Sequence, residues 1–359
     1  MILTVTLNTA LDLTYGVPAL VPHTSHRVTA PVERPGGKGV NVARVLTALG
    51  HDTVVTGFAG GRTGAVLRDH LAAYSETPGH LAAHSGTPGT SAAPDAAPAP
   101  AGAPRAHPAP PADARPAAPA PAPGTLTDAL VPVSGDTRRT LAVVDRATGD
   151  TTQFNEPGPH ITAEEWTAFL GTYRELLAGA DAVALCGSLP PGIHVGAYAE
   201  LIRLARAAGV PALLDTSGEP LRRGIAARPD LIKPNADELA QLTGSREPLR
   251  ATRDARRRGA HTVIASLGPD GLLALTPDGG WQASPPAPVK GNPTGAGDSA
   301  VAGLLSGLVE QLAWPDRLRR AVALSTATVL APAAGDFDRA AYEELLPRVT
   351  VERHAPGAA

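Results

Sequence analysis

Residues 291–305 of the chain read GNPTGAGDSAVAGLL, and this stretch decides the fold class and points to a chemistry. Small residues lead up to Asp298, which opens a run of small and apolar residues at helical spacing. The pattern predicts a glycine-rich loop that enters the N-terminus of a helix, with Asp298 in its first turn. Unpaired backbone N–H groups and the helix dipole make such a terminus attractive to anions. A carboxylate beside an anion site suits phosphoryl transfer, because it can take the proton of an attacking hydroxyl.

Taken alone, the same stretch also fits a simpler structure. An aspartate that follows a glycine-rich turn commonly caps a helix and has no further role. The rest of the chain has to favour one of the two interpretations.

The composition indicates a globular protein from a reducing compartment. The 359 residues suffice for one large or two medium domains, and 43% of them are hydrophobic. The formal net charge is −3, and the basic cluster from Arg253 to Arg258 reads as a solvated helix face, so nucleic-acid binding is not expected. A single cysteine, Cys186, excludes an intramolecular disulfide and favours a cytoplasmic protein. We expect neither a signal peptide nor a transmembrane helix, and therefore no membrane partner.

Strands and helices alternate along most of the chain. Residues 2–7 and 53–58 are rich in β-branched and apolar side chains, as buried strands are. After residue 160, further strands are predicted between helices, at 182–185, 212–215, 231–233 and 262–266. This alternation predicts an α/β fold with a mostly parallel sheet and helices on both faces.

Other parts of the chain depart from the alternation. Residues 12–35 and 133–156 read as short, exposed strands and a hairpin. Residues 75–124 are mostly an Ala/Pro tract, which cannot bury a core, so we expect a disordered insertion there. Residues 351–359 are expected to be a flexible tail. The remaining segments, expected to form the α/β core, are 1–11, 36–74, 125–132 and 157–350.

Polar or glycine-rich segments follow the predicted strands at five places. They are Asp12, Gly36–Asn41, Lys233–Glu238, Ser266–Gly271 and Gly295–Asp298. Because ligands of open α/β sheets bind at the carboxyl edge of the strands, we expect these segments to converge on one site. Lys38 and Asn41 lie where a glycine loop meets a helix and can contact a polar ligand there. This loop matches neither a Walker phosphate loop nor a dinucleotide fingerprint.

Two pairs of polar residues suggest phosphate and metal binding. Asn235 and Glu238 share one face of a predicted helix start, where an amide and a carboxylate suit a hydrated Mg²⁺ that bridges phosphates. A capping pair for the helix explains the same spacing. Arg138 and Arg139 open a strand of the hairpin, and because side chains alternate between faces, one of them is expected to face a phosphate.

Two long motifs resemble the paired signatures of the ribokinase-like (PfkB) carbohydrate kinases. They are GGKGVNVARVLTALG at 36–50 and NPTGAGDSAVAGLL at 292–305. Shorter motifs, TLNTALD, DTRRT, GSLPPG, LIKPNADEL and SLGPDG, resemble the phosphosugar branch, with its 1-phosphofructokinases and tagatose-6-phosphate kinases. The resemblance covers the chain except 75–124 and the tail. It implies a three-layer α/β sandwich with a small β-sheet lid made from 12–35 and 133–156.

The resemblance also implies roles for individual residues. Asp298 would be the catalytic base, beside an anion hole formed by Gly295, Ala296 and Gly297. The residues that would hold the sugar phosphate are Asp12, Gly37, Lys38, Asn41 and Arg138. Those that would contact ATP are Lys233, Ser266, Gly268 and Gly271. Asn235 and Glu238 would bind Mg²⁺.

The implied reaction is the ATP- and Mg²⁺-dependent phosphorylation of a phosphorylated ketohexose, with fructose 1-phosphate as the first expectation. Pro293 is shared with tagatose-6-phosphate kinases, whereas QFNEPG at 153–158 favours 1-phosphofructokinases. Tagatose 6-phosphate and fructose 6-phosphate therefore stay open as acceptors. A catalytically inactive sugar-phosphate-binding regulator is an alternative of a different class, against which Asp298 and the Asn235–Glu238 pair argue. A homodimer through the lid is expected from the resemblance only.

Overall fold

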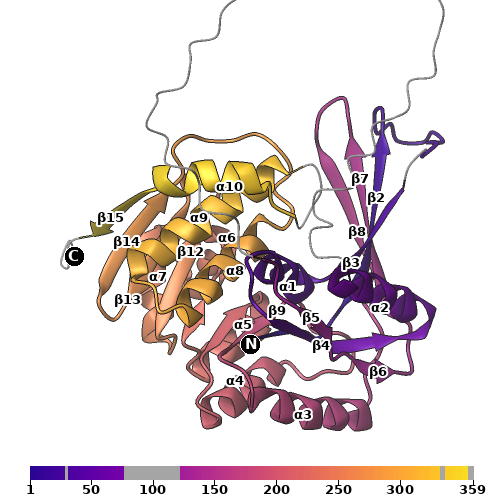
Figure 1. The fold of residues 1–359 in the computed structure, drawn as a ribbon, viewed down its shortest axis with the longest axis horizontal. Helices are drawn as coiled ribbons and strands as arrows, with labels where there is room; N and C mark the ends of the chain where they lie inside the picture. The colour runs from indigo at the N-terminus through magenta and orange to yellow at the C-terminus, as the bar shows by residue number, and fades with distance from the viewer. Residues whose placement is uncertain (29–30, 77–121, 332–335, 355–359) are drawn as a thin grey trace, which may run out of the picture.

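The central element of the fold is a large, twisted sheet (Figure 1). The computed structural model describes residues 1–28, 31–76, 122–331 and 336–354. Within them the sheet has 11 strands, in the order β15-β14-β13-β12-β11-β10-β9-β1-β4-β5, with β6 also pairing β4. The strands from β12 through β5 pair in parallel, and β13, β14 and β15 continue the sheet in antiparallel fashion. The mostly parallel sheet is therefore confirmed.

The sheet strands include the six predicted from the sequence, whose bounds agree to within two residues. The sheet strands are β1 Ile2–Thr6, β4 Thr53–Gly60, β5 Leu126–Asp128, β6 Val131–Val133, β9 Ala182–Cys186, β10 Ala212–Asp215, β11 Leu231–Ile232, β12 Thr262–Ser266, β13 Leu272–Thr276, β14 Gly279–Ser284 and β15 Thr350–His354. The helices are α1 Lys38–Ala48, α2 Gly61–Glu76, α3 Ala163–Leu177, α4 Ala197–Ala207, α5 Gly218–Ala226, α6 Ala236–Thr243, α7 Pro248–Arg257, α8 Ala296–Val309, α9 Trp314–Leu330 and α10 Arg339–Leu345.

Helices cover both faces of the sheet, because the sheet's apolar side chains alternate between two cores. Leu3 and Val5 of β1 belong to the core that packs on α3, α4, α5, α6 and α7. Ile2 belongs to the opposite core, which α1, α8, α9 and α10 cover. Burial on both faces explains why strands such as Ala182–Cys186 are apolar throughout. The fold is thus the predicted three-layer α/β sandwich.

A second, separate sheet projects from the core and forms the lid (Figure 1). Its strands are β2 Ala10–Val17, β3 Val32–Gly36, β7 Arg138–Asp145 and β8 Thr151–Asn155, in the order β3-β2-β7-β8. These strands lie mostly in the segments predicted for the lid, but β2 begins at Ala10 and β3 ends at Gly36, in segments predicted as core. The turn between β7 and β8 is the predicted hairpin turn.

The structure corrects two predictions made from the sequence. A third prediction concerns residues that lie mostly outside the described part of the chain. Residues 351–354 belong to β15, which pairs with β14 along its whole length, so only 355–359 could form the expected tail, and they lie outside the described residues. Asp12 does not lie in the loop after β1: the chain turns at Leu7 and Asn8, and Asp12 lies inside β2. Most of the predicted insertion, residues 77–121, also lies outside the described part of the chain.

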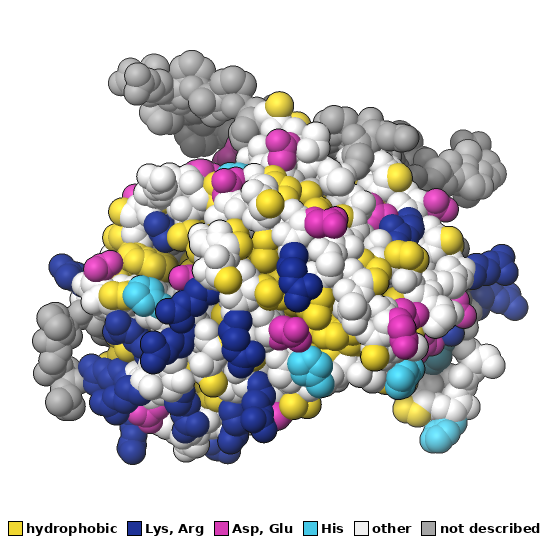
Figure 2. All heavy atoms as spheres, turned by 90° about the horizontal axis from the view of Figure 1, so that it is seen from below, with side chains coloured by type: hydrophobic (Ala, Val, Ile, Leu, Met, Phe, Trp, Pro, Cys, Tyr) yellow, Lys and Arg dark blue, Asp and Glu magenta, His cyan; other side chains and the backbone are white. Residues whose placement is uncertain are grey.

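Arginine side chains gather on one side of the molecule, over the region of α7 (Figure 2). Arg257 has 79% of its side chain exposed and lies 3.2 Å from Asp254. Arg223 of α5 lies 2.8 Å from Glu219. These pairs at the surface agree with the interpretation of the basic cluster as a solvated helix face.

Candidate active site

The glycine-rich loop 291–297 leads into the N-terminus of α8 as predicted. Gly295 has φ of 85°, a left-handed conformation that favours glycine, and it begins the helix without a side-chain cap. Ser299 N donates to Gly295 O at 2.9 Å, and Ala296 N donates to Pro293 O at 3.1 Å. Among the described residues, no acceptor pairs with the N–H of Gly297 or Asp298. The helix end therefore offers unpaired donors to an anion.

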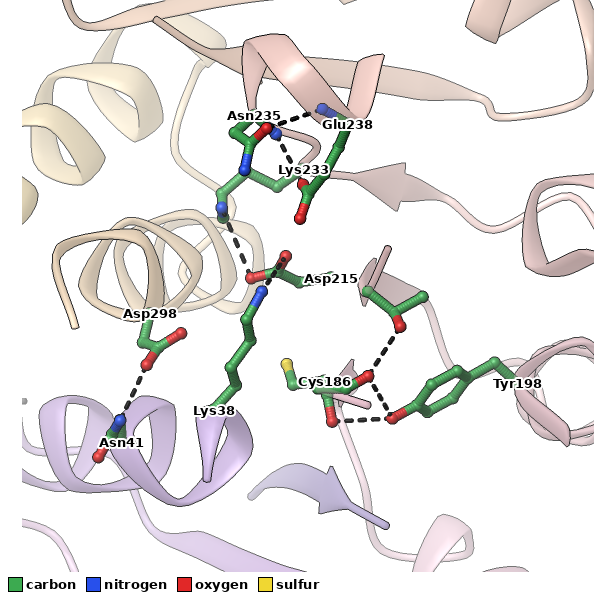
Figure 3. A network of polar contacts seen from close by, with 11 residues as sticks. Lys38, Asn41, Cys186, Tyr198, Asp215, Lys233, Asn235, Glu238 and Asp298 are labelled. Carbon is green, nitrogen blue, oxygen red and sulfur yellow. Dashed lines mark hydrogen bonds and ion pairs between the residues drawn. The ribbon is translucent and has the colours of Figure 1, made fainter. Parts of the chain in front are cut away.

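Asp298 lies in the first turn of α8 and is buried, with 7% of the residue exposed. Asn41 Nδ2, from α1, donates to Asp298 Oδ2 at 2.9 Å and orients the carboxylate (Figure 3). Burial raises the pKa of Asp298 to about 6, although the nearby Lys38 lowers it. A carboxylate with such a pKa is ionised at neutral pH and still accepts a proton readily.

Asp215, at the end of β10, holds two lysines at the centre of the site (Figure 3). Its Oδ1 lies 3.2 Å from Lys38 Nζ, and its Oδ2 lies 3.5 Å from Lys233 Nζ. Burial alone would raise the pKa of Asp215, but Lys233 and Lys38 outweigh burial and lower it. The charge of Asp215, with a smaller contribution from Asp298, raises the pKa of Lys38 despite burial. Lys38 is therefore held as a cation.

Sequence reasoning did not propose Asp215 as a site residue. The available signal was its position: it is an acid at the end of a predicted strand, like the segments that were proposed. Thr140 was missed as well, and its signal was weaker because a threonine in a strand is unremarkable by type.

Lys233 reaches the N-terminus of α8. A Cβ on Gly297 would lie only 3.4 Å from Lys233 Nζ. The ammonium group thus adds a full positive charge to the partial charge of the helix end. Lys38 and Lys233 share Asp215. One cluster, as predicted, therefore contains the two lysines, Asp298 and the residues from Gly295 to Gly297.

The loop before α1 brings the backbone close to β1 and to the lid. Gly37 has φ of 104°, and a Cβ on it would lie 2.6 Å from Thr6 Cγ2. A Cβ on Gly36 would lie 2.1 Å from the Asp12 carboxyl carbon, so the carboxylate packs directly on the Gly36 backbone. Glycine is required at both positions because of this close approach.

Asp12 and Arg138 form a second polar group, on the lid. The Thr140 hydroxyl donates to Asp12 Oδ1, across neighbouring strands. Burial raises the pKa of Asp12, while Thr140 and Arg138 lower it. Arg138 Nε donates to Asn8 O at 3.3 Å and its Nη1 to Glu156 O at 3.2 Å. Of the arginine pair, Arg138 is half-buried, whereas the exposed Arg139 pairs with Glu156, so only Arg138 is placed to face a ligand.

Asn235 and Glu238 form a capping box at the N-terminus of α6. Asn235 Oδ1 accepts from Glu238 N at 2.8 Å, and Glu238 Oε2 accepts from Asn235 N at 2.9 Å. The alternative capping interpretation is therefore correct for the structure as it stands. In the part of the chain that the structure describes, no donor pairs with Glu238 Oε1, and the charge of Glu238 contributes to the raised pKa of Lys38. Figure 3 shows its carboxylate on the side of α6 that faces Asp215.

Of Asn235 and Glu238, only Glu238 offers an oxygen atom to a magnesium ion. Within the described ranges, no three His, Cys, Asp or Glu side chains are grouped as metal ligands. Mg²⁺ that keeps several waters and binds substrate phosphates needs only one or two carboxylates, however. The free oxygen of Glu238 meets that need, whereas Asn235 Oδ1 is already engaged by the backbone.

Ser266, Gly268 and Gly271 lie at the end of β12, beside α6. Ser266 N donates to Pro234 O at 3.0 Å, which ties this loop to the Lys233–Glu238 segment. Gly268 has φ of 60° and Gly271 has φ of 91°. A pocket of about 320 Å³ adjoins the loop. It is lined by Leu267, Pro269, Asp270, Gln282, Ser284, Pro285, Pro286, Ala287 and Pro288.

Tyr198 holds the backbone at the end of β9, on one side of the site. Tyr198 Oη donates to Cys186 O at 2.8 Å and lies 3.1 Å from Gly187 O (Figure 3). Burial, with the charges of Asp215 and Asp298, raises the pKa of the Cys186 thiol. The cysteine is therefore a packed, neutral side chain and not a nucleophile.

The chain matches a family model described as pfkB family carbohydrate kinase over residues 5–75 and 125–340. The match leaves out 76–124, the stretch interpreted above as an insertion. A 1-phosphofructokinase of Rhodobacter capsulatus is 35% identical over 330 residues, which cover 90% of this chain and 89% of that relative.

Solved structures share the fold. Phosphofructokinase-2 from Escherichia coli in complex with fructose-6-phosphate matches with a TM-score of 0.76 at 28% identity, covering 96% of this chain and 98% of that one. A possible 1-phosphofructokinase from Thermotoga maritima matches in fold with a TM-score of 0.75 at 24% identity, covering 99% of this chain and 100% of that one.

Proposed function

Since this chain belongs to the pfkB family of carbohydrate kinases and is a phosphotransferase with a hydroxyl acceptor, we propose that it phosphorylates a ketohexose phosphate with ATP. The preferred acceptor is fructose 1-phosphate, and the product is fructose 1,6-bisphosphate. The similarity to a 1-phosphofructokinase along 90% of the chain supports this choice of sugar.

The observation that carries the proposal is the position of Asp298 at the N-terminus of α8. The carboxylate, oriented by Asn41, removes the proton of the acceptor hydroxyl. The N–H groups of Gly297 and Asp298, together with Lys233, stabilise negative charge on the transferring phosphoryl group. Asp12, Gly37, Lys38 and Arg138 hold the sugar phosphate, with the two cations directed at its existing phosphate.

The nucleotide lies along the loop that contains Ser266, Gly268 and Gly271, with Lys233 near its phosphates. Glu238 would hold Mg²⁺ through its Oε1, while Asn235 keeps the backbone of the α6 N-terminus in place. When bound, the ion neutralises phosphate charge and orients the nucleotide. The free oxygen of Glu238 and its proximity to the lysine cluster support this placement.

We further propose a cytoplasmic enzyme that dimerises through the lid. Among the residues that the structure describes, there is no helix long and apolar enough to cross a membrane. The lid exposes the apolar side chains of Phe154, 59% exposed, and Val32, 41% exposed, which a second lid could cover. One solved relative, phosphofructokinase-2 from Escherichia coli, is described in a tetrameric form.

Release of ADP, measured with fructose 1-phosphate, fructose 6-phosphate and tagatose 6-phosphate as acceptors, tests the proposal. We expect the highest kcat/KM with fructose 1-phosphate. Without Mg²⁺ we expect no ADP release. A strong preference for either 6-phosphate would refute the choice of sugar and leave the kinase class intact. Binding of a sugar phosphate without ADP release from any acceptor would instead identify an inactive regulator.

Fructose 6-phosphate is the second candidate, favoured by one observation. The solved phosphofructokinase-2, 28% identical to this chain, is described in complex with that sugar phosphate. The lower identity, compared with 35% for the 1-phosphofructokinase, places it second.

A further inference from the structure

A row of polar side chains crosses the lid and continues into the core. In the register of the lid sheet, Asp12 of β2 lies opposite Arg34 of β3 on one side and Thr140 of β7 on the other. Side chains directly opposite one another in a sheet point to the same face. Thr140 donates to Asp12, whereas Arg34 is directed out of the lid.

Arg34 meets a carboxylate of the core, Asp336, which also binds a second arginine. Arg34 Nη1 donates to Asp336 Oδ2, and Arg44 Nη2 of α1 donates to Asp336 Oδ1. The side chain of Arg44 is 1% exposed, that of Asp336 12% and that of Arg34 20%. One carboxylate thus joins a lid strand to a core helix, and each of its oxygens serves a different element.

The core side of this junction is firmly held. Asp338 N donates to Ala327 O of α9 at 3.1 Å. The rings of Phe337 and Tyr342 pack edge to face with centroids 5.7 Å apart. The guanidinium of Arg44 also lies 4.9 Å from the centre of the Tyr74 ring. Asp336 is therefore a fixed point against which the lid can be placed.

Helix α1 connects the same junction to the reacting groups. Arg44 follows Asn41 by three residues, so the two lie on one side of α1. Asn41 donates to Asp298, and Arg44 is close enough to Asp12 to lower its pKa slightly. The contacts therefore run from the sugar-binding residue on the lid to the helix that orients the proposed base.

We propose that Asp336 is a positioning residue, which holds the lid strands β2 and β3 at a fixed distance from α1 through Arg34 and Arg44. The effect is to place Asp12 in register with Asp298, so that the sugar is bound with its hydroxyl at the base. This inference rests on the proposed function for its kinetic consequences, but not for the contacts themselves.

Arg34→Gln is the variant that tests the junction most cleanly. Replacing Asp336 would leave the buried Arg44 unpaired, which destabilises the fold by itself. Arg34→Gln removes only the lid half and leaves the Arg44–Asp336 pair in place. Arg34→Lys is the conservative variant that keeps the cation, and Arg146→Gln removes an exposed lid arginine that takes no part in the junction.

We expect kcat/KM for fructose 1-phosphate to fall by about 10²-fold in Arg34→Gln, the loss that a misplacement of about 1 Å produces. KM for ATP should not change, and Arg34→Lys should recover most of the loss. Arg146→Gln should behave as the unmodified protein. An equal rise in KM for the sugar phosphate and for ATP, or an unchanged kcat/KM for fructose 1-phosphate, would overturn the proposal.

Amide hydrogen exchange gives a readout that does not depend on turnover. In Arg34→Gln, the amides of β2 and β3 should exchange faster, while those of α1 keep their protection. If the unmodified protein phosphorylates none of the ketohexose phosphates, the proposed function fails, yet the exchange result still decides whether Arg34 and Asp336 hold the lid. Unchanged exchange in β2 and β3 would refute that role.

Discussion

At the scale of single residues, Asp298 is the group on which the proposed chemistry depends most. Its carboxylate is buried, oriented by Asn41 and placed beside unpaired N–H groups. In Asp298→Asn the site keeps its shape and loses its proton acceptor, so we expect kcat to fall by about 10²–10⁴-fold. Steady-state ADP release measures the loss. Asp316→Asn, a change at an exposed aspartate of α9, should leave kcat as it is, and near-normal turnover by Asp298→Asn would remove Asp298 from the mechanism.

The raised pKa of Asp298, about 6, predicts how rate depends on pH. Because the base must be ionised to accept a proton, kcat/KM should fall about tenfold for each pH unit below that pKa. A pH profile of kcat/KM checks this. A profile that stays flat to pH 4.5 would show that another group, or none, takes the proton.

The raised pKa of Asp298 also predicts how the stability of the fold depends on pH. Burial raises the folded-state pKa of Asp298 from 3.8 to about 6. Its contribution to stability is therefore full below pH 3.8 and is lost as the pH rises through about 6. At pH 7 the charged carboxylate destabilises the fold, so Asp298→Asn should raise Tm while it lowers kcat. A thermal melt of both proteins at pH 7 measures the difference, and a fall in Tm would contradict this account.

At the scale of elements, the N-terminus of α6 combines a structural and a proposed metal-binding role in Glu238. Glu238→Gln keeps the capping box, since glutamine can also accept from Asn235 N, and removes only the negative charge. We expect the Mg²⁺ concentration for half-maximal activity to rise by about 10- to 100-fold, the range found when groups that support a metal are replaced. A Mg²⁺ titration of activity measures it. A parallel fall in Tm with an unchanged Mg²⁺ requirement would leave Glu238 a capping residue only.

The contact between Asp12 and Gly36 predicts a specific defect in sugar binding. A Cβ at Gly36 would lie 2.1 Å from the Asp12 carboxyl carbon, so Gly36→Ala must push the carboxylate from its place. We expect KM for the sugar phosphate to rise by at least about tenfold, which corresponds to a loss of about 1.4 kcal/mol in binding free energy. KM for ATP should stay the same. Gly171→Ala, at a position with open space around it, is the matched control and should bind both substrates normally.

The elements themselves were largely predictable because their signals are local. The alternation of apolar strands with helices predicted β9 through β12 to within a residue or two. Strand β15 was missed because TVERH is polar and lies near a chain end, where only its pairing with β14 makes it a strand.

The site was predictable where it lies at strand ends and less so where side chains meet across the fold. The topology rule grouped Lys38, Lys233 and Asp298 correctly. It could not show that Asp215 binds both lysines, or that Asp336 binds arginines about 300 residues earlier in sequence, because such pairs depend on three-dimensional packing. It also could not separate the capping and metal-binding interpretations of Asn235, which have the same spacing.

At the scale of the whole molecule, the lid is the part that leaves an apolar side chain and a strand edge uncovered in a single chain. Phe154 in β8 is 59% exposed, and among the described residues no other strand lies beyond β8 in the lid sheet. If two lids cover each other, Phe154→Ser should shift the protein from dimer to monomer, which sedimentation equilibrium would measure. Val195→Ser removes an apolar side chain of similar exposure, 48%, away from the lid and should leave the mass unchanged. A monomeric unmodified protein would refute lid-mediated dimerisation.

The pair of ammonium groups on Asp215 has a practical consequence. The chain contains three lysines in all, Lys38, Lys233 and Lys290, and its other basic side chains are arginine or histidine. Two of the three flank the same buried carboxylate, and the third directly precedes the loop that enters α8. Selective isotope labelling of lysine would therefore give a nuclear magnetic resonance spectrum with three side-chain signals, two of them from the proposed site, in a protein of 36.5 kDa. Binding of a sugar phosphate or of ATP at the proposed site can be tested from those two resonances without a mutation or an attached probe.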